Sequence, residues 1–164
     1  MKLSCSVLVV NLLFLVMPSI ALTQDFKKGL SAYKVGDYAS AIEEWTPLAD
    51  QGNAFAQYKL GFMYKSGKGV PLDYGIAVRW YHLAATQGNA SAQSNLGFMY
   101  KTGKGVPQDF LQAYMWYELA DTNGHKDAEK WLHNVSRKMS PTDIETAQAM
   151  ASECLIRSYK SCGW

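Results

Sequence analysis

The sequence predicts an all-α protein built from stacked helix pairs, and three observations support this prediction. Residues 53–73 read NAFAQYKLGFMYKSGKGVPLD and residues 89–109 read NASAQSNLGFMYKTGKGVPQD, so one segment occurs twice with an offset of 36 residues. Apolar residues within each copy recur at helical spacing, and glycines follow each helical stretch. Self-similarity with a period of roughly 20 to 50 residues is typical of repeat proteins, in which each repeat is one supersecondary unit.

Residues 1–21 are predicted to be a secretory signal peptide. Lys2 supplies a positive start, residues 7–10 and 12–17 form an apolar run, and small residues at Ser19 and Ala21 precede a cleavage site. The apolar run is shorter than the roughly 20 residues that a membrane-spanning helix needs. The alternative to a cleaved signal peptide is an uncleaved membrane anchor, which the short apolar run disfavours. We expect the mature chain to be periplasmic or secreted, without stable membrane insertion.

The composition of the remaining 143 residues limits the classes of partner. This length is enough for one domain with a substantial core. Lys and Arg number 15 after removal of Lys2, against 14 acidic residues, and this near balance predicts neither a nucleic-acid-binding protein nor a polybasic membrane-binding one. Two cysteines remain, Cys154 and Cys162, and an even pair in an exported chain predicts one disulfide. Two free thiols are the alternative, because a sequence does not give the Cα separation that a bridge requires.

The first helix of each copy carries an apolar stripe. Spacing of i, i+4, i+7 and i+8 places these residues on one helix face: Ala56, Leu60, Met63 and Tyr64 in one copy, and Ala92, Leu96, Met99 and Tyr100 in the other. Gly67 and Gly69 are expected to end the helix, because glycine readily adopts the positive φ angles of a helix C-cap and a tight loop.

The second helix of the first copy is expected to begin at Asp73, whose side chain can accept hydrogen bonds from free backbone amides. Its helical spacing predicts a core-facing side made of Ile76, Ala77, Trp80, Leu83 and Ala84. Small residues such as Gly61 would let the paired helices approach closely, while Trp80 and Tyr81 would fill the space between pairs.

The residues of both copies carry a family resemblance. The pattern A-x-x-x-L-G-x-M-Y-x-x-G-x-G-V-x-x-D, followed by A-x-x-W-Y-x-x-A-A-x-x-G, resembles the Sel1-like repeat, a relative of the tetratricopeptide repeat. Two units match, residues 53–88 and 89–124, and residues 22–52 look like a tetratricopeptide-like helix pair. Residues 125–164 depart from the pattern, because His133 replaces the glycine and Ser136 the tyrosine. Ser140 and Pro141 then open a final helix that looks like a cap.

The resemblance implies about eight helices in four antiparallel pairs, stacked as a short right-handed solenoid with a concave groove lined by the first helix of each pair. The expected groove residues are Phe55, Tyr58, Phe62, Lys65, Ser91, Ser94, Phe98 and Lys101, continued by Asp127, Lys130, Asn134 and Arg137. Aromatic side chains beside a few polar groups suit a peptide-binding groove. The alternative is that Phe62 and Phe98 only pack against the neighbouring helix.

Fragments that imitate catalytic or metal-binding motifs are explained by the repeat. Residues 31–34 spell S-x-x-K and residues 101–103 spell K-T-G, two of the three signatures of serine β-lactamases and penicillin-binding proteins. The third, S-D-N, is absent, and residues 65–67 are the counterpart of K-T-G in the other copy. No second metal ligand accompanies any histidine, so all three are predicted to be exposed surface residues: His82, His125 and His133. We assign no catalytic residue, cofactor or metal.

The predicted function is that of an exported, non-catalytic repeat scaffold that binds a protein or peptide partner in the cell envelope, and neither nucleic acid nor membrane. One alternative is an envelope hydrolase or β-lactam-interacting protein on the same scaffold. Another is a small-ligand or glycan binder, suggested only by the Trp and Tyr content.

Overall fold

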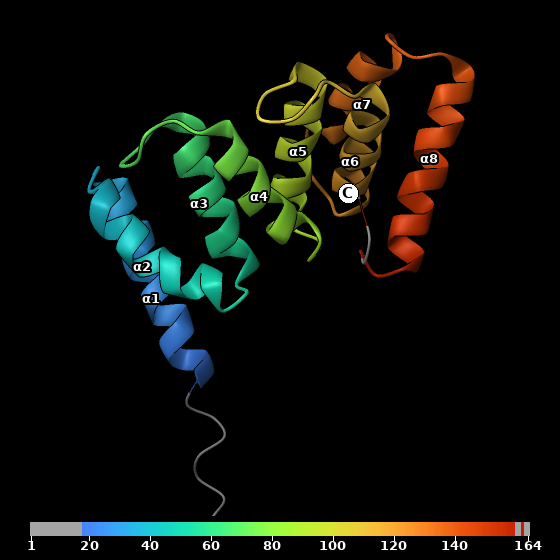
Figure 1. The fold of residues 1–164 in the computed structure, drawn as a ribbon. Coiled ribbons are helices and arrows are strands. Elements are labelled where there is room, and N and C mark those ends of the chain that lie inside the picture. Colours follow the sequence, from blue (N-terminus) through green and yellow to red (C-terminus); the bar gives the residue numbers. More distant parts are fainter. Residues whose placement is uncertain (1–17, 160–161, 163–164) are drawn as a thin grey trace, which may run out of the picture.

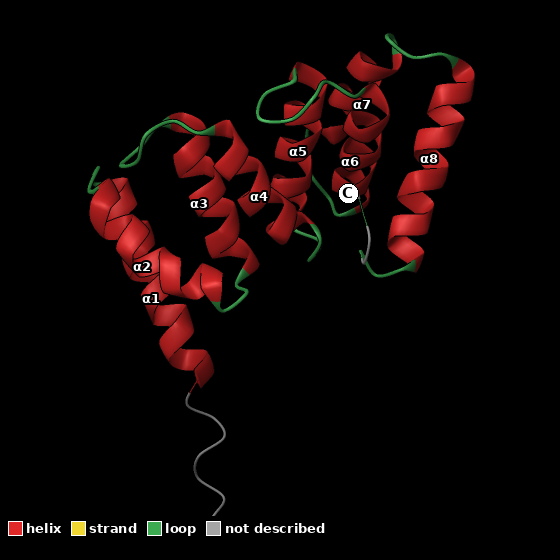
Figure 2. Ribbon diagram, viewed as in Figure 1, coloured by secondary structure: helices red, strands yellow, loops and turns green. Residues whose placement is uncertain are grey.

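The computed structural model describes residues 18–159 and residue 162, and this part of the chain is a curved stack of helices (Figure 1). The described residues contain eight α-helices and no strand (Figure 2): α1 Pro18–Lys34, α2 Tyr38–Asp50, α3 Ala54–Ser66, α4 Tyr74–Ala85, α5 Ala90–Thr102, α6 Phe110–Thr122, α7 Ala128–Ser136 and α8 Pro141–Ile156. The predicted all-α fold with about eight helices is confirmed.

The predicted signal peptide lies mostly outside the described residues. Residues 1–17 fall outside them, and only the last four residues of the predicted peptide belong to α1. In the described part of the chain, no helix has both the length and the apolar character needed to cross a bilayer.

Helices that follow each other in the sequence pack in pairs along most of the stack. The pairs are α1 with α2, α3 with α4, and α5 with α6, while contacts of α2 with α3 and of α4 with α5 join one pair to the next. The expected fourth pair is different, because α7 and α8 both pack against α6 and make few contacts with each other. Figure 1 shows α8 as the last helix at one end of the stack.

Local hydrogen bonds fix the helix ends where the sequence predicted them. The Asp73 carboxylate accepts from the backbone N–H of Ile76 at 2.8 Å and so caps α4. Ser140 and Asp143 form a reciprocal capping box at the start of α8. Gly67 ends α3 with a φ of +64°, the left-handed conformation expected of a glycine C-cap.

A glycine on the first helix of each pair lies directly against an aromatic ring of the second. A Cβ atom added to Gly61 would lie 2.7 Å from the Tyr81 ring, and one added to Gly97 would lie 2.6 Å from the Tyr117 ring. Both rings are fully buried. The expectation that small residues let paired helices approach is therefore confirmed, and the contact is between backbone and ring.

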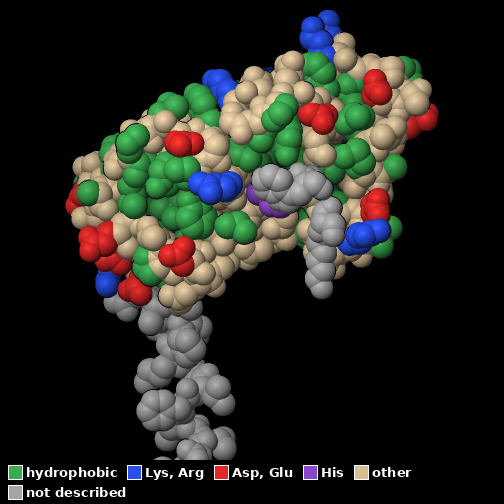
Figure 3. Space-filling model, in the orientation of Figure 1, with side chains coloured by type: hydrophobic (Ala, Val, Ile, Leu, Met, Phe, Trp, Pro, Cys, Tyr) green, Lys and Arg blue, Asp and Glu red, His purple; other side chains and the backbone are tan. Residues whose placement is uncertain are grey.

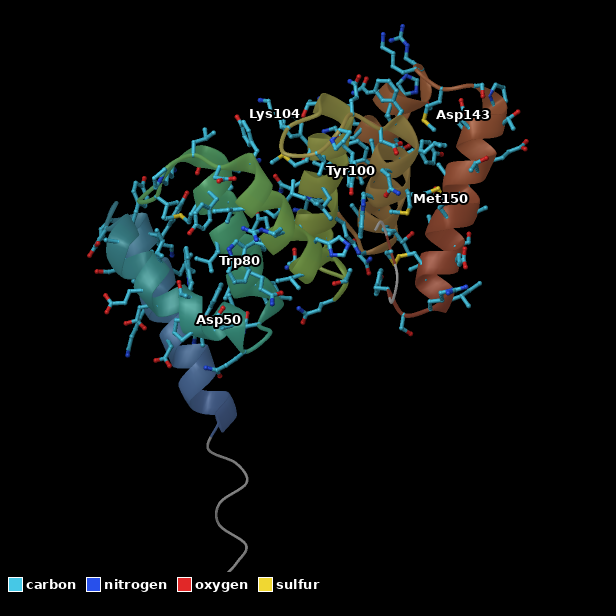
Figure 4. All side chains as sticks on the ribbon, viewed as in Figure 1. Asp50, Trp80, Tyr100, Lys104, Asp143 and Met150 are labelled. Atoms are coloured by element: carbon cyan, nitrogen blue, oxygen red, sulfur yellow. A yellow bond between two sulfur atoms is a disulfide. The ribbon has the colours of Figure 1, made fainter. Side chains whose placement is uncertain are left out.

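The buried side of α4 differs from the prediction. Ala77 and Ala84 are buried as expected, but Trp80 is only half-buried and Leu83 is 47% exposed. The remaining buried residues of this helix are Val78, Tyr81, His82 and Ala85. The reason is that α4 packs against both α3 and α5. Its buried side is therefore wider than one helical stripe and includes residues next to the predicted ones. Figure 4 labels Trp80 on this helix.

Buried glutamines connect each helix pair to the previous one. Gln57 donates to the carbonyl of Ala49 at the end of α2 at 3.0 Å, and Gln93 donates to the carbonyl of Ala85 at the end of α4 at 3.1 Å. Both amides also accept a hydrogen bond from the end of their own pair's second helix: from Gln87 at 2.8 Å and from Asn123 at 3.0 Å. These hydrogen bonds satisfy polar groups that would be costly to bury alone.

The C-terminal tail returns onto the stack after α8. Cys154 and Cys162 form the expected disulfide, with their Cα atoms 5.4 Å apart. The carbonyl oxygen of Cys162 accepts a hydrogen bond from Nε2 of His82 at 2.8 Å, and the Tyr159 hydroxyl exchanges hydrogen bonds with the side chain of Asn123. The tail thus contacts helices that precede it by up to 80 residues.

The prediction that all three histidines are exposed is wrong for His82, which is only 9% exposed. The returning tail covers it, and its ring lies edge-on to Trp116 with the centroids 5.8 Å apart. His125 is half-buried beside Trp131, and His133 is exposed.

Replacing Gly97 with alanine should destabilise the protein, although alanine is the better helix former. Overpacking against a buried ring costs roughly 1–3 kcal/mol, whereas the gain in helix propensity is at most about 1 kcal/mol. Thermal unfolding should give a lower melting temperature for Gly97→Ala than for Thr102→Ala, an exposed control on the same helix. A melting temperature equal to or above that of the control would contradict the close packing of Gly97 on Tyr117.

Gly105→Ala should be more destabilising than Gly103→Ala. Both glycines have positive φ, +75° and +68°, so the backbone strain is similar. Only at Gly105 would the new methyl group collide with backbone, that of Tyr74 at the start of α4; at Gly103 the nearest atom is Cβ of Gln108, at 3.4 Å. We expect a further loss on the order of 1–2 kcal/mol in urea denaturation of Gly105→Ala. Equal losses would contradict the close approach of Gly105 to the Tyr74 backbone.

Acidification should weaken the folded state through His82. Burial lowers the pKa of this imidazole below its ordinary 6.5, and the hydrogen bond to Cys162 opposes the shift only partly. Since the unfolded chain then binds the proton more readily, the contribution of His82 to stability is complete above pH 6.5 and is lost as the pH falls towards the folded-state pKa. The drop in melting temperature between about pH 7.5 and about pH 5 should be smaller in His82→Gln. An identical drop in both proteins would assign the pH dependence to other groups.

Candidate functional site

The predicted groove residues of α3 lie on a partly exposed face. Phe55 is 65% exposed, while Tyr58, Phe62 and Lys65 are half-buried. The Phe55 ring makes an edge contact with Phe26 of α1 at 6.3 Å between centroids. Burial raises the pKa of Tyr58, and a hydrogen bond with the Ser91 side chain opposes this shift. Tyr58 therefore links α3 to α5 at the base of the face.

The corresponding residues of α5 are less exposed. Ser91, Phe98 and Lys101 are half-buried, and Ser94 is only 5% exposed, so that it lies at the floor of the face rather than on its open side. The predicted continuation on α7 and its flanks is fully at the surface: Asp127, Lys130, Asn134 and Arg137.

An open hollow of about 240 Å³ is lined by residues of α3, α5, α6 and α7 and of the loop before α7. Its lining residues are Lys65, Ser94, Asn95, Phe98, Lys101, Tyr117, His125 and Trp131. Four of these were expected from the sequence. Asn95 lies one position away from the predicted stripe, and Tyr117 belongs to a second helix. His125 and Trp131 come from the degenerate third unit, where no repeat pattern indicated which residues face the hollow. The aromatic character of Trp131, next to the predicted groove residue Lys130, was nevertheless a usable signal.

Lysine side chains lie over the aromatic rings of this face. Lys65 Nζ is 5.7 Å from the centre of the Phe62 ring and 5.6 Å from that of Phe98, so it lies between the two copies of the same residue. Lys68 and Lys104, one in each copy of the glycine loop, lie over Phe62 and Phe98 respectively, each at 5.6 Å. We call these three lysines, with Lys59, Lys101 and the rings of Tyr33, Phe62 and Phe98, the lysine–aromatic ladder. Such contacts are worth roughly 0.5–1 kcal/mol each at exposed sites.

Neutral oxygen atoms hold two of the ammonium groups. Lys65 donates to Oδ1 of Asn95 at 2.6 Å, and Lys68 donates to the Tyr33 hydroxyl at 3.1 Å. Burial lowers the pKa of Lys65, and the nearby charge of Lys104 lowers it further. The hydrogen bond with Tyr33 instead raises the pKa of Lys68. Figure 4 shows Lys104 on the loop after α5, at the same edge of the stack as the loop after α3.

The residues that imitate catalytic motifs do not form a shared site. Ser31 is on α1, where its hydroxyl donates to the carbonyl of Lys27. Lys101 and Thr102 are the last residues of α5, and the Thr102 hydroxyl donates to the carbonyl of Phe98. Three helices lie between α1 and α5 along the chain. Among residues 18–159 and 162, no three His, Cys, Asp or Glu side chains are grouped so as to hold a metal ion.

Comparison with known proteins places the two copies in a family. The sequence profile described as Sel1 repeat matches residues 54–89 and 90–125. No curated protein matches the chain.

Two solved structures are similar. One is c5321, a protective antigen that is present in uropathogenic Escherichia coli strains and displays an SLR fold. It has 26% identity and a TM-score of 0.78 over 84% of this chain. The other is a Sel1 repeat protein from Oxalobacter formigenes, with 30% identity and a TM-score of 0.67, also over 84%. The chain spans 31% of the length of the first and 56% of the second.

Proposed function

Because the chain is a Sel1-like repeat protein, we propose that it is an exported, non-catalytic scaffold that binds a protein or peptide partner in the cell envelope. Sel1 repeats generally serve as protein-interaction scaffolds. The proposed binding surface is the face of α3 and α5 that carries the lysine–aromatic ladder, together with the hollow beside it. It extends over both repeats, and this suits an extended segment that crosses several helices.

The observation that supports this proposal most directly is the open hollow of about 240 Å³ beside half-buried aromatic residues. Ligand pockets for small molecules typically enclose about 300–1,000 Å³ and bury most of the ligand. The hollow is smaller and open, which favours one or two side chains of a larger partner over a whole small ligand or glycan.

Two features support export. Residues 1–21 have the charge and hydrophobicity pattern of a signal peptide, and Cys154 and Cys162 form a disulfide. Disulfides persist in oxidising compartments, such as the bacterial periplasm, and are rare in the cytosol. Both features agree with a periplasmic or secreted protein.

Site-specific photocrosslinking in the native envelope would test the binding surface. A photoreactive phenylalanine analogue replaces Phe98, which lines the hollow, or Leu83, which is exposed on α4 outside the proposed surface. We expect a discrete crosslinked partner with the analogue at position 98 and none at position 83. Crosslinking at position 83 alone, or nitrocefin turnover by the purified protein, would contradict the proposal.

A further inference from the structure

Positive charge is concentrated in the middle of the chain. Residues 51–108 contain six Lys and Arg residues but a single acidic residue, Asp73, while every other acidic residue precedes or follows this segment. On the face drawn in Figure 3, acidic side chains lie mostly toward the two ends of the stack. Five of the six basic residues belong to α3, α5 or the loops that follow them: Lys59, Lys65, Lys68, Lys101 and Lys104. The near balance of charge over the whole chain conceals this local excess.

The protein itself does not neutralise these lysines. The carboxylate of Asp73 already caps α4. In the part of the chain that the structure describes, the salt bridges are Lys28 with Asp25 and Arg157 with Glu153, and neither involves a lysine of the ladder. Rings and neutral oxygen atoms orient the ammonium groups but leave their charge uncompensated.

The charged form of Lys65 is disfavoured by its surroundings. Its side chain is half-buried between Phe62 and Phe98, and Lys104 is close enough to disfavour its charged form. A carboxylate placed between Lys65 and Lys104 would relieve both the lost solvation and the repulsion. Charge-assisted hydrogen bonds to a carboxylate are about twice as strong as neutral ones.

Apolar surface adjoins this positive charge. Phe98 and Trp131 line the same hollow as Lys65 and Lys101. Since a water molecule occupies about 30 Å³ in the liquid, the hollow has room for roughly eight, which is the volume of one or two side chains. An acidic side chain next to an apolar one would satisfy both the lysines and the rings.

We infer that the lysine–aromatic ladder and the hollow beside it bind an acidic peptide segment of the partner. Its carboxylates contact Lys65, Lys101 and Lys104, and an adjacent apolar side chain packs against Phe98. The inference rests on the proposed function, which it makes specific. Nucleic acid fits less well, because single-stranded binding proteins stack bases on free aromatic faces, and here lysines lie over those faces. Neither α3 nor α5 contains arginine.

The test compares two fluorescent peptides by anisotropy with the purified protein. One alternates glutamate with leucine, and the other has glutamine in place of every glutamate. We expect the glutamate peptide to bind about tenfold more tightly at low salt, with the difference shrinking between about 50 mM and about 300 mM NaCl. A single-stranded oligo-dT of similar length is the third probe.

Matched variants locate the charge requirement. The double variant Lys65→Gln/Lys101→Gln should bind the glutamate peptide about tenfold more weakly, and Lys104→Gln about threefold more weakly. Arg79→Gln removes one positive charge from the exposed side of α4 and should leave binding within about twofold. Melting temperatures verify that each variant is folded.

Equal binding of the two peptides, no binding of either up to about 1 mM, or equal losses in Arg79→Gln and Lys104→Gln would overturn the inference. Tighter binding of oligo-dT than of the glutamate peptide would also overturn it and assign the surface to nucleic acid. If any of these results is found together with a crosslinked partner at position 98, the preference for acidic peptides is wrong but the proposed partner binding stands. If the crosslink is missing as well, both fail.

Discussion

The contact between a glycine backbone and an aromatic ring sets the distance between paired helices, and the rest of the stack depends on that distance. Gly29 faces Trp45, Gly61 faces Tyr81 and Gly97 faces Tyr117, one contact in each of the first three pairs. The position that corresponds to Gly97 in the third unit is His133, an exposed residue, so this glycine–ring contact is not repeated there. In this unit α7 and α8 do not pair closely, and both pack on α6 instead.

Because consecutive pairs have the same internal geometry, the same residues recur on one face of the stack. Phe62 and Phe98 occupy equivalent positions, and Lys65 lies between them. Residues that look purely architectural in the sequence therefore also build the candidate binding surface. Because Lys65 and Lys68 recur as Lys101 and Lys104, the basic surface extends over two repeats.

The C-terminal end of the stack is closed differently from its middle. A solenoid requires terminal units that cover the exposed core of the last repeat. Here α8, tied by the Cys154–Cys162 disulfide, brings the tail back over His82 and Asn123. Trp116, whose ring lies edge-on to His82, is completely buried, whereas its counterpart Trp80 in the middle of the stack is half-buried.

Local features were readable from the sequence because neighbouring residues determine them: helix spacing, the caps at Asp73 and Ser140, the left-handed Gly67 and the short loop closed by the disulfide. The face that carries the lysine–aromatic ladder was partly readable, since the repeat places equivalent residues of α3 and α5 on it. The burial of His82 and the position of α8 were not readable. Each depends on contacts between segments far apart in the chain, and helical periodicity carries no information about which distant segment covers a given face.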